Sequence, residues 1–372
     1  MFFKDIVGQK ALIADLLGAV KTDKIAHGQL FIGNEGYGTF PLALAFSRYI
    51  LCENPSESDA CGTCTSCLQI SELQHPDLHF VYPVVQSISK TSEGVYPLWR
   101  EFVKDNVYFT LFDWVRFLDT KERQPIIGSE ESREIVRKIS LKSFQGGYKI
   151  MIIFSAGEMN DSAANKVLKI LEEPPAKTIF ILLSENPQAI LPTIRSRTQS
   201  VQVNRLQAYE ISTYLQRKQG MDAQVADGLA SFADGDLCAA LDLFKEGETT
   251  ARYRNLFINL MRSSYKKDVI QMMDWADEIA AISKERQKIF ALYCLHMLRQ
   301  SLLLNYLGAD HVRLTQEEFA FVERFSPYIT GNNIKLFMEE LDHAHYHLER
   351  NANPKILFTQ MSFQSMRFIH RA

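Results

Sequence analysis

The sequence lacks the features that would direct a chain of 372 residues to a membrane or an export pathway. No stretch reaches the roughly 20 uninterrupted apolar residues of a membrane span. The N-terminal residues MFFKDIVGQK contain neither a long apolar run nor a cleavage pattern, so we expect no secretory signal and a cytoplasmic protein. Basic charge is also not in excess: 41 Lys and Arg face 44 Asp and Glu, a net charge of −3. Bulk electrostatics therefore does not drive this chain onto DNA.

Cysteine is scarce but clustered. Four of the six cysteines follow the spacing C-x8-C-x2-C-x2-C, at Cys52, Cys61, Cys64 and Cys67. In a chain without an export signal, such a cluster favours a metal site over disulfides. Four thiolates at about 2.3 Å complete a tetrahedral zinc site, which would be structural because no position remains for water. There are two alternatives: an iron–sulfur cluster, which uses the same ligands, and a redox-active cysteine pair. The isolated Cys238 and Cys294 are expected in the core.

Three short apolar runs predict strands that are buried on both faces of a sheet. They read QLFI (29–32), KIMIIF (149–154) and TIFILL (178–183). Helical patterns separate them over 42–51, 131–140 and 163–173. Alternating strands and helices predict a doubly wound α/β domain with a parallel sheet. After about residue 205 the strand signal stops. Helices are then expected at 208–219, 223–233 and 237–244, and helical structure from residue 249 onward.

Residues 33–40 read GNEGYGTF, which has the frame of a phosphate-binding loop, G-x-x-x-x-G-K-[ST]. Gly33 and Gly38 have the right spacing, and with Gly36 they permit a tight turn whose backbone N–H groups can surround phosphate. However, Thr39 stands where Lys should meet the terminal phosphates, and Phe40 where a hydroxyl should bind Mg²⁺. An unrelated glycine-rich turn is the alternative interpretation of the loop taken alone.

The strand over 149–154 should end in the acidic pair that holds the metal and activates water, but it ends in Phe154-Ser155. Four groups that nucleotide hydrolysis requires are therefore missing. We predict a degenerate, inactive phosphate site, with Gly33, Gly36, Gly38 and Thr39 as its remnant.

Two further motifs carry a family resemblance: NKVLKILEEPP over 165–175 and LPTIRSRT over 191–198. Together with AHGQLFIG, the degenerate loop, the four cysteines and His75-Pro76-Asp77, they resemble the AAA+ clamp-loader subunits of bacterial DNA polymerase III. The resemblance is specific over about residues 1–245 and architectural beyond. Thr39, Phe40, Phe154 and Ser155 depart from the gamma/tau branch, and Cys238 replaces the sensor-2 arginine of family ATPases. These departures favour a non-hydrolysing branch of the family.

The resemblance implies a stator that helps load the sliding clamp onto primed DNA. Arg197, in an S-R-C-like element with Thr198 at the third place, would be an arginine finger reaching the neighbouring subunit's ATP site. The partners implied are delta and gamma/tau subunits, which would form a hetero-oligomer with this chain. The chain would reach primer-template DNA and the clamp through that complex. The domains implied are an AAA+-like domain (1–205) with a zinc module (52–67) and an aromatic insertion (about 80–127), a helical lid (206–247), and a helical collar (248–372).

Two rival functions remain open at this point: an ATP-hydrolysing gamma/tau-like motor subunit, and a zinc-containing DNA-binding module. The first predicts ATP turnover by the purified chain, and the second predicts salt-sensitive duplex binding. The aromatics between 80 and 117 are expected to be buried in a helical subdomain, with partner binding as the alternative. His343 and His347 could share a helix face with His345 nearby, but a solvated or packed face is the expected interpretation.

Overall fold

The computed structural model describes residues 1–119, 123–144, 146–245, 247–282, 284–312, 314–349 and 352–371. The chain forms two compact units. One comprises Met1–Glu210 with Gly235–Cys238, and the other comprises Ile211–Asp234 with Ala239–Ala372. The finer division into three domains stays a prediction. The part of the aromatic insertion at 120–122 lies outside the described residues.

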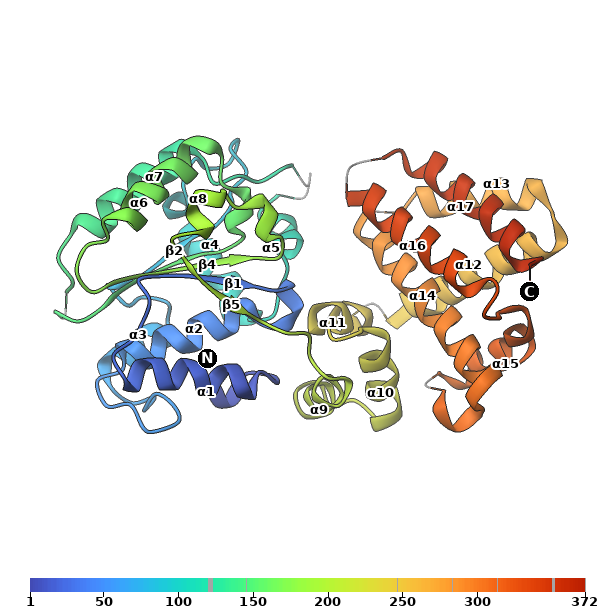
Figure 1. Ribbon diagram of the computed structural model, residues 1–372, viewed down its shortest axis with the longest axis horizontal. Coiled ribbons are helices and arrows are strands. Elements are labelled where there is room, and N and C mark those ends of the chain that lie inside the picture. The colour runs from blue at the N-terminus through green and yellow to red at the C-terminus, as the bar shows by residue number, and fades with distance from the viewer. Residues whose placement is uncertain are drawn as a thin grey trace. The chain divides into compact units, whose positions relative to one another are not determined.

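A five-stranded sheet organises the first unit (Figure 1). Its strands are β1 (Gly28–Ile32), β2 (Leu78–Val81), β3 (Lys149–Ile153), β4 (Thr178–Ser184) and β5 (Gln199–Gln202). Their spatial order is β2-β3-β4-β1-β5, and every neighbouring pair is parallel. The predicted α/β class with an AAA+-like parallel sheet is thereby confirmed. Strands β2 and β5 lie at the two edges and were not among the predicted runs.

Helices cover both faces of this sheet. They are α1 (Lys10–Lys21), α2 (Thr39–Leu51) and α3 (Thr65–Ser71) on one face, and α6 (Ser129–Ser140), α7 (Asp161–Glu172) and α8 (Pro192–Arg195) on the other (Figure 1). Alternate strand residues serve the two faces, as the pleat requires. Phe31 and Ile152 belong to the core cluster that contains α2, whereas Leu30 and Met151 belong to the cluster that contains α6 and α7.

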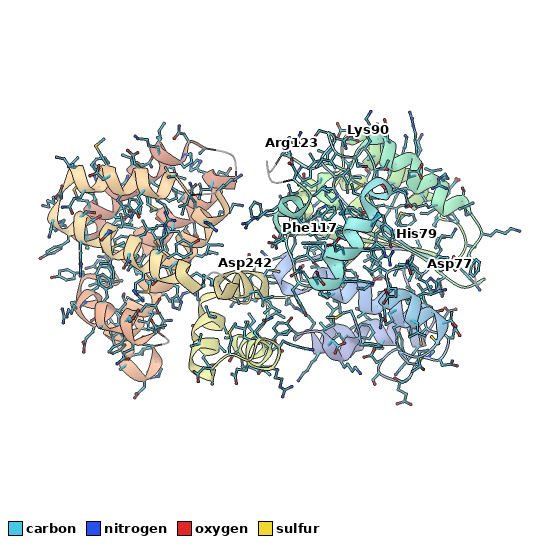
Figure 2. The ribbon with its side chains drawn as sticks, turned by 180° about the vertical axis from the view of Figure 1, so that it is seen from behind. Asp77, His79, Lys90, Phe117, Arg123 and Asp242 are labelled. Carbon is cyan, nitrogen blue, oxygen red and sulfur yellow. The ribbon has the colours of Figure 1, made fainter. Side chains whose placement is uncertain are left out.

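The aromatic insertion forms a short helical subdomain against the α2 face. It contains η3 (Ser92–Val95), α4 (Tyr96–Asp105) and α5 (Leu111–Leu118). Trp99 and Trp114 are fully buried, and the Trp114 indole donates a 2.9 Å hydrogen bond to the Pro83 carbonyl. Phe117, which Figure 2 labels, keeps 45% of its surface exposed by contrast. The expected burial of the aromatics in a helical subdomain is thus observed for most of them.

Every described element beyond residue 205 is helical, as predicted. These helices are α9 (Ala208–Gln219), α10 (Ala223–Phe232), α11 (Leu237–Lys245), α12 (Gly247–Lys266), α13 (Val269–Ala280), α14 (Lys284–Leu307), α15 (Gln316–Phe325), α16 (Ile334–Glu349) and α17 (Pro354–Ile369). In the second unit, α12, α13, α14, α16 and α17 share one core that includes Phe257, Trp275 and Phe358. Across the described residues, none of the helices has the length and apolarity that a membrane crossing needs.

The packing of the insertion generates a stability prediction. Phe109 is 3% exposed and its ring contacts Phe40 and Trp99. Phe109→Ala should lower the free energy of unfolding by about 3–5 kcal/mol, because it removes a buried ring and leaves a cavity. Phe144→Ala is the matched control, since Phe144 is 78% exposed and should change stability little. Urea titration followed by tryptophan fluorescence measures both, and equal effects would contradict the assignment of Phe109 to the core.

Candidate functional site

The loop between β1 and α2 is the glycine-rich loop that the sequence singled out. It runs from Gly33 through the 3-10 turn η2 (Glu35–Tyr37) to Gly38, where α2 begins. Gly38 has φ +92°, a left-handed conformation that favours glycine. A Cβ on Gly33 would lie 2.5 Å from the Val203 carbonyl oxygen, so this position also requires glycine. The predicted strand–loop–helix frame is therefore present.

A carboxylate from a distant segment lies against the middle of this loop. A Cβ on Gly36 would lie only 1.7 Å from Oδ1 of Asp236, the residue that directly precedes α11. Gly36 therefore makes room for a protein carboxylate. An anionic side chain at this place opposes the approach of anionic phosphate.

A second carboxylate, Glu35, belongs to the loop itself and is held from two directions. Its Oε2 accepts a 2.6 Å hydrogen bond from the backbone N–H of Leu111, at the start of α5. Its Oε1 accepts a 2.9 Å hydrogen bond from the Ser155 hydroxyl, directly after Phe154 at the end of β3. The Glu35 N–H donates in turn to Oε1 of Glu185, at 2.9 Å. These bonds tie the loop to the insertion and to the ends of β3 and β4.

The space that remains beside Glu35 is too small for a phosphate group. A cavity of about 10 Å³ is lined by Gly33, Glu35, Thr39, Phe154, Ser155, Leu183, Ser184 and Glu185. That volume is at the lower limit for a single water molecule. Burial raises the pKa of Glu35 well above its ordinary range, and the neighbouring Glu185 carboxylate raises this pKa further. Two acidic side chains thus line a nearly closed space that a nucleotide would need to enter.

Phe40 in α2 and Phe154 after β3 contact each other. The rings of Phe40 and Phe154 lie 5.9 Å apart at 85°, an edge-to-face arrangement. Trp99 and Phe109 of the insertion contact both rings at centroid distances of 5.0 to 5.8 Å. Such pairs stabilise by about 0.5–1.5 kcal/mol each beyond their area burial. Neither ring can bind a hard cation, and Thr39, 2% exposed, is closed off from solvent as well.

Arg197 lies on the surface of the first unit, directly after α8. Its side chain keeps 39% of its surface exposed and its Nη2 lies 2.8 Å from Oε1 of Glu172, at the end of α7. Nη1 donates to the Thr193 carbonyl at 3.1 Å. Arg197 is therefore reachable from outside the chain. Glu172 belongs to the LEEPP motif, so the two sequence motifs that carried the resemblance meet at this ion pair.

The four predicted metal ligands converge. The sulfur atoms of Cys52, Cys61, Cys64 and Cys67 all lie within 4.8 Å of one another, and the 52–64 and 61–67 pairs are separated by 4.0 Å. A tetrahedral site with Zn–S bonds of about 2.3 Å needs sulfurs about 3.8 Å apart. The donor set and its spacing therefore fit a structural zinc ion. This group of four is the one His, Cys, Asp and Glu cluster of this kind among the residues that the structure describes.

The surroundings favour the thiolate at Cys61, whereas burial raises the pKa of Cys52 and of Cys67 and so disfavours the thiolate there. The backbone N–H groups of Thr63 and Cys64 lower the pKa of Cys61 to about 6. The buried Arg48 guanidinium lies against the Phe2 ring, 4.4 Å from its centroid. Burial lowers the pKa of Arg48, and the Cys67 thiolate opposes that shift. A cation close to the sulfur cluster offsets the net negative charge of four thiolates.

The sequence reasoning missed two carboxylates, Glu35 and Glu185, and it did not foresee that Glu172 of the LEEPP motif pairs with Arg197. Glu35 carried a signal, because an acidic residue inside a phosphate loop is itself a departure from phosphate binding. Cys238 and Cys294 are buried as expected. His343 and His347 are exposed on α16, while the side chain of His345 lies outside the described residues.

Comparison with known proteins identifies relatives over most of the chain. The profile of the family described as "DNA polymerase III, delta subunit" matches residues 8–207, more than half of the chain. DNA polymerase III subunit delta' of Escherichia coli (strain K12) is 27% identical over 297 residues, which cover 80% of this chain and 75% of that protein. The delta' subunit of Bacillus subtilis (strain 168) is 25% identical over 339 residues, or 91% and 90%. Subunit tau of the same bacterium is 23% identical over 376 residues, covering 96% of this chain and 60% of tau.

The raised pKa of Glu35 generates a pH-dependence prediction. Because the folded state holds the Glu35 proton more tightly than the unfolded state, stability is lost as pH rises from the ordinary Glu pKa of about 4.3 through the raised value. Glu35→Gln mimics the protonated form and does not titrate. The difference in melting temperature, variant minus parent, should therefore become more positive between pH 5 and pH 8.

The matched control is Glu72→Gln, because a hydrogen bond from Lys104 lowers the pKa of the exposed Glu72. The difference in melting temperature between Glu72→Gln and the parent should be small and should not become more positive as pH rises. A flat Glu35→Gln difference across the same pH range would contradict a buried, reluctantly ionised Glu35.

Proposed function

The chain belongs to the DNA polymerase III, delta subunit family, and on that premise we propose that it is a non-hydrolysing stator of the replicative clamp loader. The clamp-loader resemblance inferred from the sequence is confirmed by the family match and by the delta' relatives. Beyond that shared level, we propose the delta' role: assembly with delta and gamma/tau subunits, with ATP bound and cleaved at the neighbouring subunit's site.

The observation that carries this proposal is the position of Glu35. Its carboxylate is held inside the loop by Leu111 and Ser155, beside a cavity of about 10 Å³. A nucleotide would have to displace a hydrogen-bonded carboxylate. The positions expected to hold a Lys, a Mg²⁺-binding hydroxyl and an acidic pair are occupied by Thr39, Phe40, Phe154 and Ser155. This argues against the rival gamma/tau-like motor, although the similarity to tau covers nearly the whole chain.

Arg197 supports the second half of the proposal. A planar guanidinium supplied in trans stabilises the charge that develops on a transferring phosphoryl group. The exposed pair with Glu172 leaves Arg197 accessible, and exposed ion pairs are worth only about 0–1 kcal/mol. Exchanging Glu172 for a neighbour's phosphate oxygens would therefore cost little. In this proposal Glu172 holds the guanidinium in the free subunit, and the neighbour's nucleotide takes it over on assembly.

We further propose that Cys52, Cys61, Cys64 and Cys67 hold one structural zinc ion. Zinc would fix the fold of the 52–67 module, and all four coordination positions would be filled by sulfur. Phe2 packs against this module, and Asp59 within it accepts hydrogen bonds from the Phe3 and Lys4 N–H groups. The zinc would thereby anchor the N-terminal segment as well.

The remaining parts of the proposal concern organisation. The region 1–205 would act as the AAA+-like domain, 206–247 as the lid and 248–372 as the collar that joins the ring. The protein would work in the cytoplasm and reach primer-template DNA and the sliding clamp through the complex.

The finger is tested in a loader reconstituted with its own delta and gamma/tau subunits and clamp. Arg197→Ala should leave assembly intact and depress DNA-stimulated ATP turnover. A finger is worth about 10³–10⁵ in turnover, so the contribution of the one site it serves should disappear. Arg197→Lys should fail to restore that contribution, because an ammonium lacks the planar fork.

The matched control is Arg137→Ala. Arg137 is also exposed and also pairs with a glutamate, Glu134, at 2.7 Å, but it lies on α6 outside the proposed contact. Its turnover should equal that of the parent. If Arg197→Ala assembles and hydrolyses ATP at the parental rate, the finger assignment is wrong.

The zinc proposal is tested by elemental analysis. The purified chain should contain about one zinc per molecule, and Cys64→Ser should lose it and melt at a lower temperature. Cys238→Ala, at a buried cysteine outside the cluster, should keep the metal. Iron in place of zinc, or a metal-free parent with an unchanged melting temperature, would overturn this assignment.

A further inference from the structure

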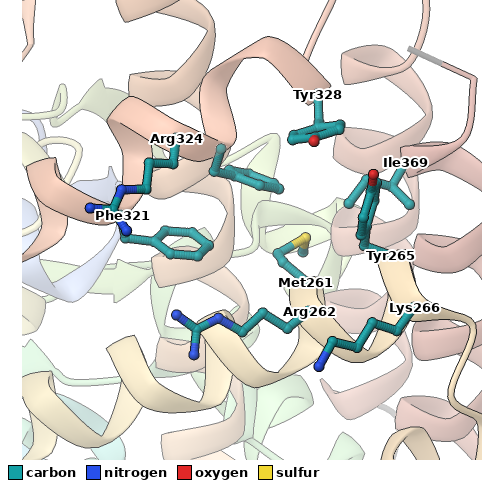
Figure 3. Close-up of a pocket in the computed structure, with 9 residues that line it drawn as sticks. Met261, Arg262, Tyr265, Lys266, Phe321, Arg324, Tyr328 and Ile369 are labelled. Atoms are coloured by element: carbon teal, nitrogen blue, oxygen red, sulfur yellow. The ribbon is translucent and has the colours of Figure 1, made fainter.

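A pocket of about 210 Å³ lies within the second unit, far along the chain from the phosphate loop. Its walls come from α12, α15, the turn η7 (Ser326–Tyr328) and the end of α17 (Figure 3). Met261, Phe321, Phe325 and Ile369 make its interior apolar. The pocket combines this apolar interior with a rim of positively charged side chains.

Three cations line this pocket: Arg262 and Lys266 on α12, and Arg324 on α15 (Figure 3). No carboxylate lines it, although the chain as a whole carries a net charge of −3. Within the described part of the chain, none of the three forms an ion pair. Glu317, two turns before Arg324 on α15, is already paired with Arg254. Among the described residues, no carboxylate pairs with the positive charge at the rim, which would attract an anionic ligand.

The aromatic rings in the pocket already pack against other rings, which bears on the kind of ligand. Tyr265 is stacked on His370 with 20° between the ring planes and meets Tyr328 edge-on at 5.0 Å. Phe321 is stacked on Phe325 at 5.2 Å. Single-stranded nucleic acid needs free aromatic faces on which bases can stack. The pocket offers ring edges and an apolar hollow, which suit the insertion of one side chain.

The surface beyond the pocket also favours a protein ligand. The chain continues from Lys266 into α13, whose first turn exposes Val269 (45%) and Ile270 (74%). Tyr265 and Tyr328 at the rim are themselves 49% and 36% exposed. A contiguous exposed apolar patch rimmed by polar residues is typical of a protein interaction site. Tyr, Phe, Met and Arg are also the residues enriched in protein interfaces.

We propose that this pocket docks an acidic peptide segment of a partner protein. One apolar side chain of the peptide, such as Leu or Phe, would enter the hollow above Met261, and Asp or Glu residues on either side would pair with Arg262, Lys266 and Arg324. This docking site would act independently of Arg197 and of the phosphate loop. It would let the second unit recruit a further protein without using the first.

The test uses the full chain and a phage-displayed library of random 12-residue peptides. Enriched peptides should carry a Leu or an aromatic residue with at least two Asp or Glu within three positions. A synthetic, fluorescein-labelled copy should bind in an anisotropy titration, more weakly as salt rises. The double variant Arg262→Glu/Arg324→Glu should weaken binding at least tenfold, and so should replacing the apolar residue of the peptide by Ala.

The matched control is Arg217→Glu/Lys218→Glu, two exposed cations on α9 in the same unit, which should bind like the parent. The proposal fails if the enriched peptides lack acidic residues or bind the two double variants equally well. It also fails if labelled (dT)20 binds the parent more tightly than any selected peptide and loses binding in the Arg262/Arg324 variant. In that case the pocket would be a nucleic-acid site.

Discussion

A carboxylate held inside the loop between β1 and α2 is the constraint on which the first unit depends. Glu35 accepts hydrogen bonds from the start of α5 and from the residue after Phe154, while its own N–H donates to Glu185. Opening the loop would break all of these hydrogen bonds and expose the buried Glu35 side chain. The loop therefore connects the start of α5 to the ends of β3 and β4, which is a structural role for a loop of this type.

The aromatic cluster also holds the start of α2 and the insertion together, through packing. Phe40 and Phe154 contact Trp99 and Phe109, so these two residues form one core with the insertion. A polar side chain at either position would lie among buried rings, at a cost of about 1–3 kcal/mol if it stayed unpaired.

The sequence predicted the long buried strands, because runs such as KIMIIF and TIFILL are apolar on both faces. It missed β2 and β5, which are short edge strands; β5 reads QSVQ and buries only Val201. The cysteine cluster was predictable from spacing alone, since tight turns bring nearby sulfurs together. The partners of Glu35 were not, because Leu111 and Ser155 lie 76 and 120 residues away along the chain and only the fold brings them close.

The central claim is that this chain's own phosphate site is filled by its own side chains. Titration calorimetry of the purified chain with ATP and Mg²⁺ tests it most directly. The account predicts no saturable heat up to millimolar nucleotide, a limit that corresponds to a binding free energy weaker than about −4 kcal/mol. Saturable one-to-one binding in the micromolar range, abolished by a bulky substitution at Gly38, would contradict the account.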